Sequence, residues 1–160
     1  MTLYRTLPGW LTPRERVALN VVARRSGWQP GSKGTGYQKL ELMGDVTTLR
    51  LVRRALEALG GPEQFDASLV RYPIGCAMPA HVDAATPGLC HVRLQALALA
   101  SAGGLYYLGG EEVPLDDGDA VLFRPDELKH QLTAVECNPR MVLSVGAEVS
   151  VEHARRLGLA

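Results

Sequence analysis

The sequence His81-Val82-Asp83 stands upstream of His130 and of the run Arg140-Met141-Val142-Leu143-Ser144. In an extended segment, side chains at i and i+2 lie on one face, so His81 and Asp83 can approach one metal ion while Val82 points away toward packing. His130 must then arrive from a distant strand. Two imidazoles and one carboxylate form the ligand set that binds non-haem iron(II) on one face and leaves open positions for reactants.

The order of the features around these ligands extends the pattern. An isolated histidine near an aspartate is also typical of a hydrogen-bonded surface pair, so the His-x-Asp motif alone does not identify a metal site. Here it is followed by a strand-rich stretch, by Gly118-Asp119-Ala120-Val121-Leu122-Phe123, by His130 and by the run 140–144. This order resembles the 2-oxoglutarate/Fe(II) dioxygenase superfamily over about Leu69 to Ala147. Tyr72, nine residues before the first ligand, has the spacing of prolyl-hydroxylase-type and AlkB-type members.

The resemblance also implies a co-substrate site. In such families the arginine on the last core strand pairs with the distal carboxylate of 2-oxoglutarate, and a hydroxyl four residues later often assists it. Arg140 and Ser144 match both positions. A guanidinium binds a carboxylate through two parallel hydrogen bonds, and these two residues share strand parity. The alternative is an ordinary exposed arginine and a buried serine. We expect Tyr72 to contact the same co-substrate.

A polar face runs along one predicted strand, where His91, Arg93 and Gln95 alternate with apolar residues. If this face lines the pocket, Gln95 contacts 2-oxoglutarate and Arg93 contacts the co-substrate or the substrate. If it does not, the face is the wet side of an outer strand, and the sequence leaves both possibilities open. His91 is a poorer ligand candidate because it lacks a carboxylate two residues away. Tyr106 is a second candidate substrate contact, with packing as its alternative role.

The chemistry that the resemblance implies uses Fe(II), 2-oxoglutarate and dioxygen. The expected reaction hydroxylates an unactivated C–H bond of an amino-acid, peptidyl or small-metabolite substrate, with release of succinate and carbon dioxide. Asp83 retains the carboxylate that related halogenating enzymes replace with a small residue, which favours hydroxylation. We expect no catalytic residue beyond the iron site, because the metal and co-substrate perform the difficult chemistry.

Two alternatives differ in class from a hydroxylase of small or peptidyl substrates. The first is an AlkB-type demethylase of nucleic-acid bases. Against it, Gly146 stands where that pattern has a second arginine, Val70 where it tends to have asparagine, and Ala84-Ala85 where it has an acid. A balanced charge and 6% aromatic residues also do not indicate a basic, base-stacking groove. The second alternative is a non-catalytic, cupin-like metal-binding module, although structural zinc sites usually have four protein ligands.

The length of 160 residues and the 46% hydrophobic composition fit one domain, residues 1–160, with a sizeable core. We expect a helical part at about 1–62 and a β-helix core at about 66–148. Short β-like runs separated by turns predict strands at 67–72, 91–99, 104–108, 120–123, 131–136 and 140–146. Together they predict an α+β fold: a double-stranded β-helix of the jelly-roll or cupin type, with N-terminal helices packed on the sheet.

Two helices precede these strands. Thr12-Pro13-Arg14-Glu15 is a capping box with proline at the first helical position, and its helix should continue to about Arg25. Asp45 can cap a second helix that ends at Gly60-Gly61, with an apolar stripe facing the sheet formed by Leu49, Val52, Leu56 and Leu59. Between them, residues 29–37 form a glycine-rich loop that either reaches over a pocket or simply connects.

The composition of the chain indicates the cellular location and the kinds of partner that we expect. No apolar run is long enough for a signal peptide or a bilayer span, so we expect a cytoplasmic protein without a membrane partner. Cys76, Cys90 and Cys137 are too scattered for a disulfide framework and should be reduced thiols. Basic and acidic residues number 17 each, so no global field attracts nucleic acid. The sequence does not indicate an oligomeric state.

Overall fold

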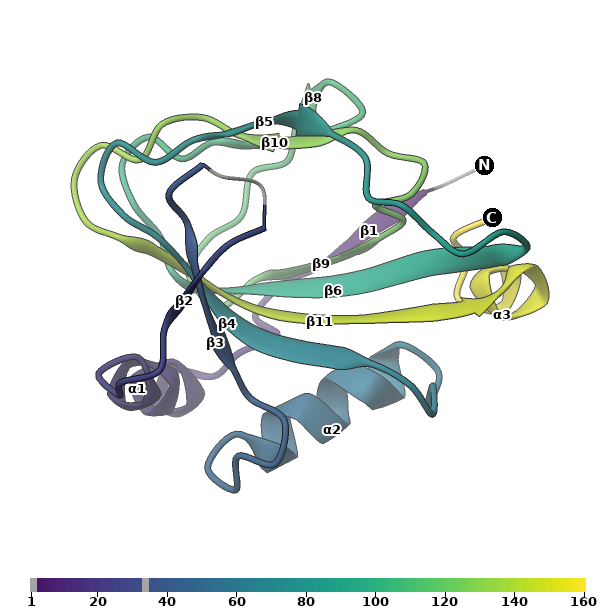
Figure 1. Cartoon of the computed structure of the whole chain (residues 1–160), viewed down its shortest axis with the longest axis horizontal. Coiled ribbons are helices and arrows are strands. Elements are labelled where there is room, and N and C mark those ends of the chain that lie inside the picture. The colour runs from purple at the N-terminus through teal and green to yellow at the C-terminus, as the bar shows by residue number, and fades with distance from the viewer. Residues whose placement is uncertain (1–2, 33–34) are drawn as a thin grey trace.

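A computed structural model describes residues 3–32 and 35–160. Two antiparallel sheets face each other (Figure 1). The larger has seven strands, in the order β1 (Tyr4–Leu7), β9 (Ala120–Phe123), β6 (Leu89–Leu99), β11 (Arg140–Ser150), β4 (Asp66–Tyr72), β3 (Gln38–Glu41) and β2 (Gln29–Pro30). The smaller has four, in the order β5 (Met78–His81), β10 (His130–Leu132), β7 (Tyr106–Leu108) and β8 (Glu111–Glu112).

Three helices complete the fold: α1 (Pro13–Val22), α2 (Leu49–Ala58) and α3 (Val151–Arg156). Figure 1 shows α1 and α2 on the face of the large sheet that points away from the small sheet. Leu19 of α1 and Leu51 of α2 belong to one buried cluster with Leu143 of β11. A second cluster, which includes Val121 and Val142, fills the space between the two sheets. The N-terminal helices therefore cover the outer face of the large sheet, and its inner face remains available for a site.

The capping box of α1 is confirmed. The Thr12 hydroxyl accepts from the backbone N–H of Glu15 at 3.3 Å, and the Glu15 carboxylate accepts from the backbone N–H of Thr12 at 2.8 Å. The helix ends at Val22, earlier than the expected Arg25. The reciprocal bonds satisfy two of the backbone donors that a helix leaves free at its start.

The predicted start of α2 at Asp45 is wrong. The Asp45 carboxylate accepts from the backbone N–H of Thr48 at 2.9 Å, which stabilises a turn before the helix, and the first helical residue is Leu49. Leu49 is 40% exposed, so the buried stripe also differs from the expected one: it consists of Leu51, Val52, Ala55 and Leu59. The predicted end is confirmed, because Gly60 and Gly61 follow with positive φ angles of 77° and 72°.

The strand predictions are right at 120–123 and close at 67–72 and 91–99. The last strand continues past 146 to Ser150, and the predicted strand 131–136 stops at Leu132. Beyond that point the backbone N–H of Val135 donates to the carbonyl of Cys76, outside the ladder, at 3.0 Å. The short strands β1, β2, β3, β5 and β8 were not predicted. No helix in the described ranges combines the length and apolarity needed to cross a membrane.

Candidate metal centre

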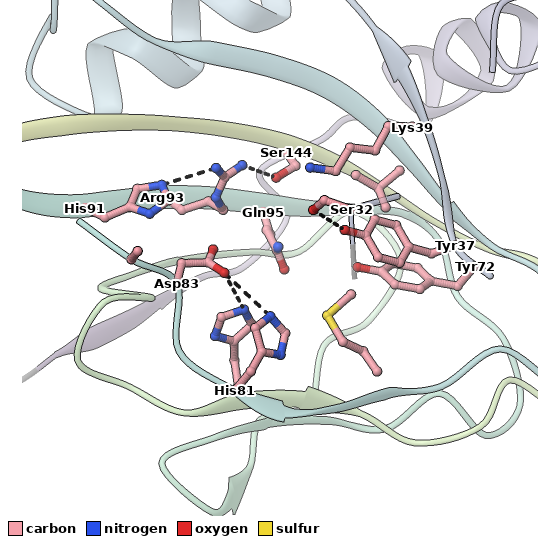
Figure 2. Close-up of a pocket in the computed structure, with 14 residues that line it drawn as sticks. Ser32, Tyr37, Lys39, Tyr72, His81, Asp83, His91, Arg93, Gln95 and Ser144 are labelled. Atoms are coloured by element: carbon pink, nitrogen blue, oxygen red, sulfur yellow. Dashed lines mark hydrogen bonds and ion pairs between the residues drawn. The ribbon is translucent and has the colours of Figure 1, made fainter. Parts of the chain in front are cut away.

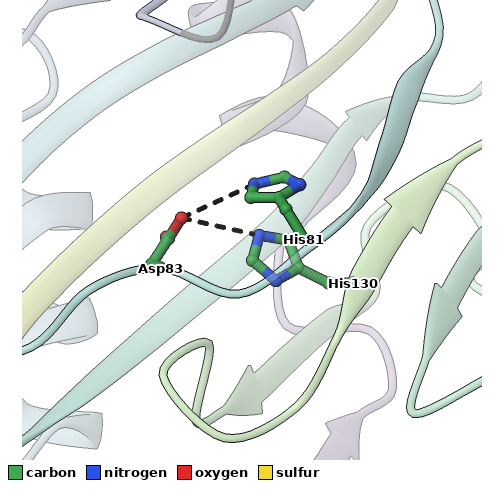
Figure 3. Close-up of side chains that lie close together, drawn as sticks. All are labelled: His81, Asp83 and His130. Atoms are coloured by element: carbon green, nitrogen blue, oxygen red, sulfur yellow. Dashed lines mark ion pairs between the residues drawn. The ribbon is translucent and has the colours of Figure 1, made fainter.

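His81, Asp83 and His130 converge in the space between the two sheets (Figure 3). His81 ends β5 and His130 begins β10, and the two are paired in the antiparallel register. The Nε2 atoms of His81 and His130 lie 3.5 and 4.0 Å from the same Asp83 oxygen, Oδ1. Strand pairing thus places the two imidazoles side by side, and the two-residue step from His81 brings the carboxylate to them.

Backbone carbonyls fix the orientation of both imidazole rings. Nδ1 of His81 lies 2.8 Å from the carbonyl oxygen of Pro79, and Nδ1 of His130 lies 3.3 Å from that of Leu128. With the proton on Nδ1, each ring donates to a carbonyl and keeps the lone pair of Nε2 toward the carboxylate. Burial, together with the neighbouring His81, lowers the pKa of His130. Its neutral form, which binds metals, is therefore favoured at neutral pH.

The geometry fits a metal ion held on one face. One ligand atom from each of the three residues can be chosen so that all lie within 4.8 Å of one another. Nitrogen and oxygen ligands at about 2.1 Å from an ion stand about 3 Å apart at right angles, so small side-chain rotations bring the three atoms to bonding distance. No fourth ligand joins this cluster within the described parts of the chain. Two imidazoles, one carboxylate and open positions match the donor set of non-haem iron(II).

The three residues lie on the wall of a cavity of about 290 Å³ (Figure 2). The large sheet forms the opposite wall. Of the expected contact residues, the structure places Tyr72, Arg93, Gln95 and Ser144 in this lining. The other residues of the large sheet that line it are Lys39, Val70 and His91, and Tyr37 lines it from the residue just before β3. The polar face of β6 therefore faces the cavity and is not the wet side of an outer strand.

Arg93 occupies space that Gly146 leaves open. Gly146 on β11 is paired with Asp66 on β4 at one side and with Arg93 on β6 at the other. The ion pair between Arg93 and Asp66, at 2.9 Å, therefore passes over Gly146. A Cβ at position 146 would lie 2.6 Å from Nη2 of Arg93. Arg93 also donates to the hydroxyl of Ser144 at 2.9 Å. The hydroxyl that we expected to assist the co-substrate is thus already bonded to a side chain.

Arg140 lies in a neighbouring cavity of about 190 Å³, together with Tyr106, and is not in the lining of the metal cavity. Its side chain is buried, so the alternative of an exposed arginine is wrong. Arg140 pairs with Tyr72 in the register of β11 and β4, and Tyr72 does line the metal cavity. Burial lowers the pKa of Arg140, an effect that Tyr72 and Tyr106 oppose.

Two polar groups in this region have no internal partner. The guanidinium of Arg140 makes no hydrogen bond or ion pair with any described residue, and the buried hydroxyl of Tyr106 has no hydrogen-bond partner among them. Buried polar groups normally have partners, and buried charges are normally paired. A buried guanidinium beside tyrosine hydroxyls is therefore suited to bind an anion.

Some cavity residues were not predicted. Tyr37 packs against Tyr72 with ring centroids 5.7 Å apart, and its hydroxyl lies 3.3 Å from that of Ser32. Both belong to the glycine-rich stretch 29–37, so its described part contributes to the cavity, while positions 33–34 lie outside the described residues. A Cβ at Gly31 would lie 2.1 Å from the Tyr37 ring, so a larger residue at position 31 would clash with that ring. The glycine at position 31 is the feature of the sequence that could have indicated this close packing.

No protein-family model matches the chain, and no curated protein matches it in sequence. Solved structures match its fold. The viral collagen prolyl hydroxylase vCPH from Paramecium bursaria Chlorella virus-1, in complex with 2-oxoglutarate, has a TM-score of 0.71 at 16% identity, covering 91% of this chain and 97% of that one. A prolyl hydroxylase from Trichoplax adhaerens, in complex with a hypoxia-inducible-factor peptide, has a TM-score of 0.74 at 13% identity, covering 98% and 87%.

A third match is HygX from Streptomyces hygroscopicus, with nickel and 2-oxoglutarate bound. Its TM-score is 0.72 at 10% identity, covering 94% of this chain and 84% of that one. At these identities the likeness establishes the fold. The chain adopts the double-stranded β-helix fold of 2-oxoglutarate/Fe(II) oxygenases, with helices on the outer face of the large sheet.

Proposed function

We propose that the protein is an iron(II)- and 2-oxoglutarate-dependent oxygenase that hydroxylates a C–H bond. The observation that carries the proposal is the convergence of His81 and Asp83 with His130, which is distant from them in the sequence, on one wall of a cavity. The solved neighbours support it, since vCPH was solved with 2-oxoglutarate and HygX with nickel and 2-oxoglutarate.

In this proposal His81, Asp83 and His130 hold Fe(II), which, with 2-oxoglutarate and dioxygen, supplies the oxidant for an unactivated C–H bond. The Nδ1 contacts of the two histidines fix which nitrogen faces the ion. Arg140 binds the distal carboxylate of 2-oxoglutarate, because it is a buried cation without an internal partner. This role requires the barrier between its cavity and the metal cavity, which Tyr72 helps to form, to open or to be bridged by the ligand.

The remaining candidate residues have supporting roles. Tyr72 and Tyr106 place hydroxyls near Arg140 and would donate to the same carboxylate. Gln95 lines the metal cavity from β6 and would contact 2-oxoglutarate closer to the iron. Ser144 acts through Arg93, whose hydrogen bond it accepts. Arg93 itself is neutralised by Asp66, and it would shape the substrate side of the cavity more than it attracts charge.

The size of the cavity supports a small reacting group. Ligand pockets commonly enclose about 300–1,000 Å³, and the metal cavity, at about 290 Å³, is just below the lower limit of that range. Such a volume holds the co-substrate and an amino-acid-sized part of the substrate. We therefore propose an amino-acid, peptidyl or small-metabolite substrate, acted on by a single domain in the cytoplasm, where its three cysteines remain free thiols.

The test is co-substrate turnover. Purified protein with Fe(II), 2-oxoglutarate and oxygen should form succinate slowly without a substrate and faster with a productive member of an amino-acid and peptide panel. Asp83→Ala should lower both rates to background. Succinate formation that persists unchanged in folded Asp83→Ala, at the same added iron concentration, would contradict the proposal.

A further inference from the structure

The turn between β9 and β10 is built around a buried ion pair. Arg124 donates to both carboxylate oxygens of Asp126, from Nε at 3.2 Å and from Nη2 at 2.7 Å. The two side chains are only 6% and 9% exposed. Glu127 adds a third contact at 2.7 Å from the solvent side. Two parallel hydrogen bonds of this kind fix the relative orientation of both side chains.

The backbone of this turn contacts two of the three candidate metal ligands. The carbonyl of Pro125, the residue between the paired side chains, accepts from the backbone N–H of Asp83 at 2.8 Å. The carbonyl of Leu128 lies 3.3 Å from Nδ1 of His130. The backbone N–H of Leu128 in turn donates to the carbonyl of Arg124 at 2.9 Å. The ion pair, the turn and the two ligands therefore form one connected set of hydrogen bonds.

Neither Arg124 nor Asp126 lines the metal cavity, so neither is placed to touch a substrate or the co-substrate. Stability is also a weak reason for the pair. Buried ion pairs pay a desolvation penalty and are often no more stabilising than apolar residues of similar volume. What such a pair does provide is a fixed geometry, and here the parts that it fixes hold Asp83 and His130.

We propose that the Arg124–Asp126 pair is a positioning device that holds Asp83 and His130 in the metal-binding arrangement before the ion arrives. The inference rests on the metal site of the proposed function. Partners that orient metal ligands from outside the coordination sphere typically change metal affinity by about 10- to 100-fold when they are removed. We expect a loss of that size in Arg124→Met and in Asp126→Asn, with the overall fold retained.

The experiment is an anaerobic titration of the apoprotein with Co(II), whose visible absorption reports both affinity and coordination geometry. The variants are Arg124→Met, the nearly isosteric Asp126→Asn, and their double mutant. The control is Arg54→Met. It also removes a partly buried arginine paired with a carboxylate, that of Glu15 at 2.8 Å, but on the helical side of the large sheet. Circular dichroism and melting temperature show which variants are folded and how far each is destabilised.

The proposal predicts weaker Co(II) binding and an altered spectrum in both single variants, and a double mutant no worse than the poorer single one, because the residues act as a pair. Arg54→Met should lose thermal stability and keep the parent affinity. Parent affinity in folded Asp126→Asn would overturn the positioning role and leave the metal site intact. If Asp83→Ala binds Co(II) as the parent does, the metal site fails, and the positioning role fails with it.

Discussion

Replacing Arg140 with methionine should stabilise the apoprotein and weaken co-substrate binding at the same time. Arg140 is 6% exposed and has no internal ion-pair or hydrogen-bond partner within the described structure. The guanidinium nitrogens of Arg140 adjoin a cavity and are not among the fully buried atoms without a partner, so the cost of leaving them unpaired lies within the range of about 1–3 kcal/mol that is typical of a buried polar group. Removing them should therefore raise stability by about 2 kcal/mol, which for a domain of this size shifts the melting temperature upward by about 4–8 °C.

The affinity for 2-oxoglutarate should change in the opposite direction. Two charge-assisted hydrogen bonds to a carboxylate are worth about 3 kcal/mol together at the lower end of their range, and their loss lowers affinity roughly 100-fold. Differential scanning fluorimetry of the apoprotein gives the first quantity, and anaerobic titration of the iron-loaded protein with 2-oxoglutarate gives the second. Iron affinity should be unchanged.

Arg71→Met is the matched control, because Arg71 is engaged: it donates to Gln38 at 2.9 Å and its guanidinium lies 4.2 Å from the centroid of the Trp28 ring. That variant should lose stability and keep its 2-oxoglutarate affinity. If Arg140→Met melts at a lower temperature than the parent and binds 2-oxoglutarate equally well, Arg140 is a structural residue and does not bind the co-substrate.

Three further outcomes follow from the same geometry. Tyr106→Phe removes a buried hydroxyl without a hydrogen-bond partner, so the melting temperature of the apoprotein should not fall, while 2-oxoglutarate titration should show weaker binding; a marked loss of stability would argue against the assignment. Gly146→Val should destabilise the fold by about 1–3 kcal/mol in chemical denaturation, because its Cβ would displace Arg93, and in an Arg93→Ala background the loss should largely disappear. The pKa of His130 is lowered from 6.5, mainly by burial, so as the pH falls the unfolded chain binds a proton before the folded one does. The free energy of unfolding should therefore decrease as the pH falls below 6.5. The same dependence of this free energy on pH in His130→Gln would contradict this.

The grouping of His81 and Asp83 was predictable because its signal is local. His81 ends β5 and Asp83 follows two residues later, and their side chains lie on the same side. The strand parity that links Arg140 with Ser144 is retained in β11. What the sequence could not supply is how far each side chain reaches. Arg140 extends into a neighbouring cavity, and Ser144 is bonded to Arg93, because pairing with β6 places that arginine over Gly146.

Other differences arise where distant contacts override local signals. Asp45 has the chemistry of a helix cap, but it stabilises a turn and the helix begins after Thr48. The strand β3 is short and polar, and it forms because β4 offers it an edge; this pairing brings Lys39 to the cavity. No role for Arg124 can be predicted from the sequence. Its turn is linked to the candidate metal centre only through the hydrogen bond from the backbone N–H of Asp83 to the carbonyl of Pro125 and the contact of the Leu128 carbonyl with His130, which form in the folded structure.

Anaerobic titration of the apoprotein with Fe(II) and then with 2-oxoglutarate, followed by visible spectroscopy, distinguishes an oxygenase centre from a metal site of another kind. We expect a weak metal-to-ligand charge-transfer band if 2-oxoglutarate chelates iron held by His81, Asp83 and His130, and no such band in Asp83→Ala. Absence of the band in folded, iron-loaded parent protein would contradict the account and favour a metal-binding module without oxygenase chemistry.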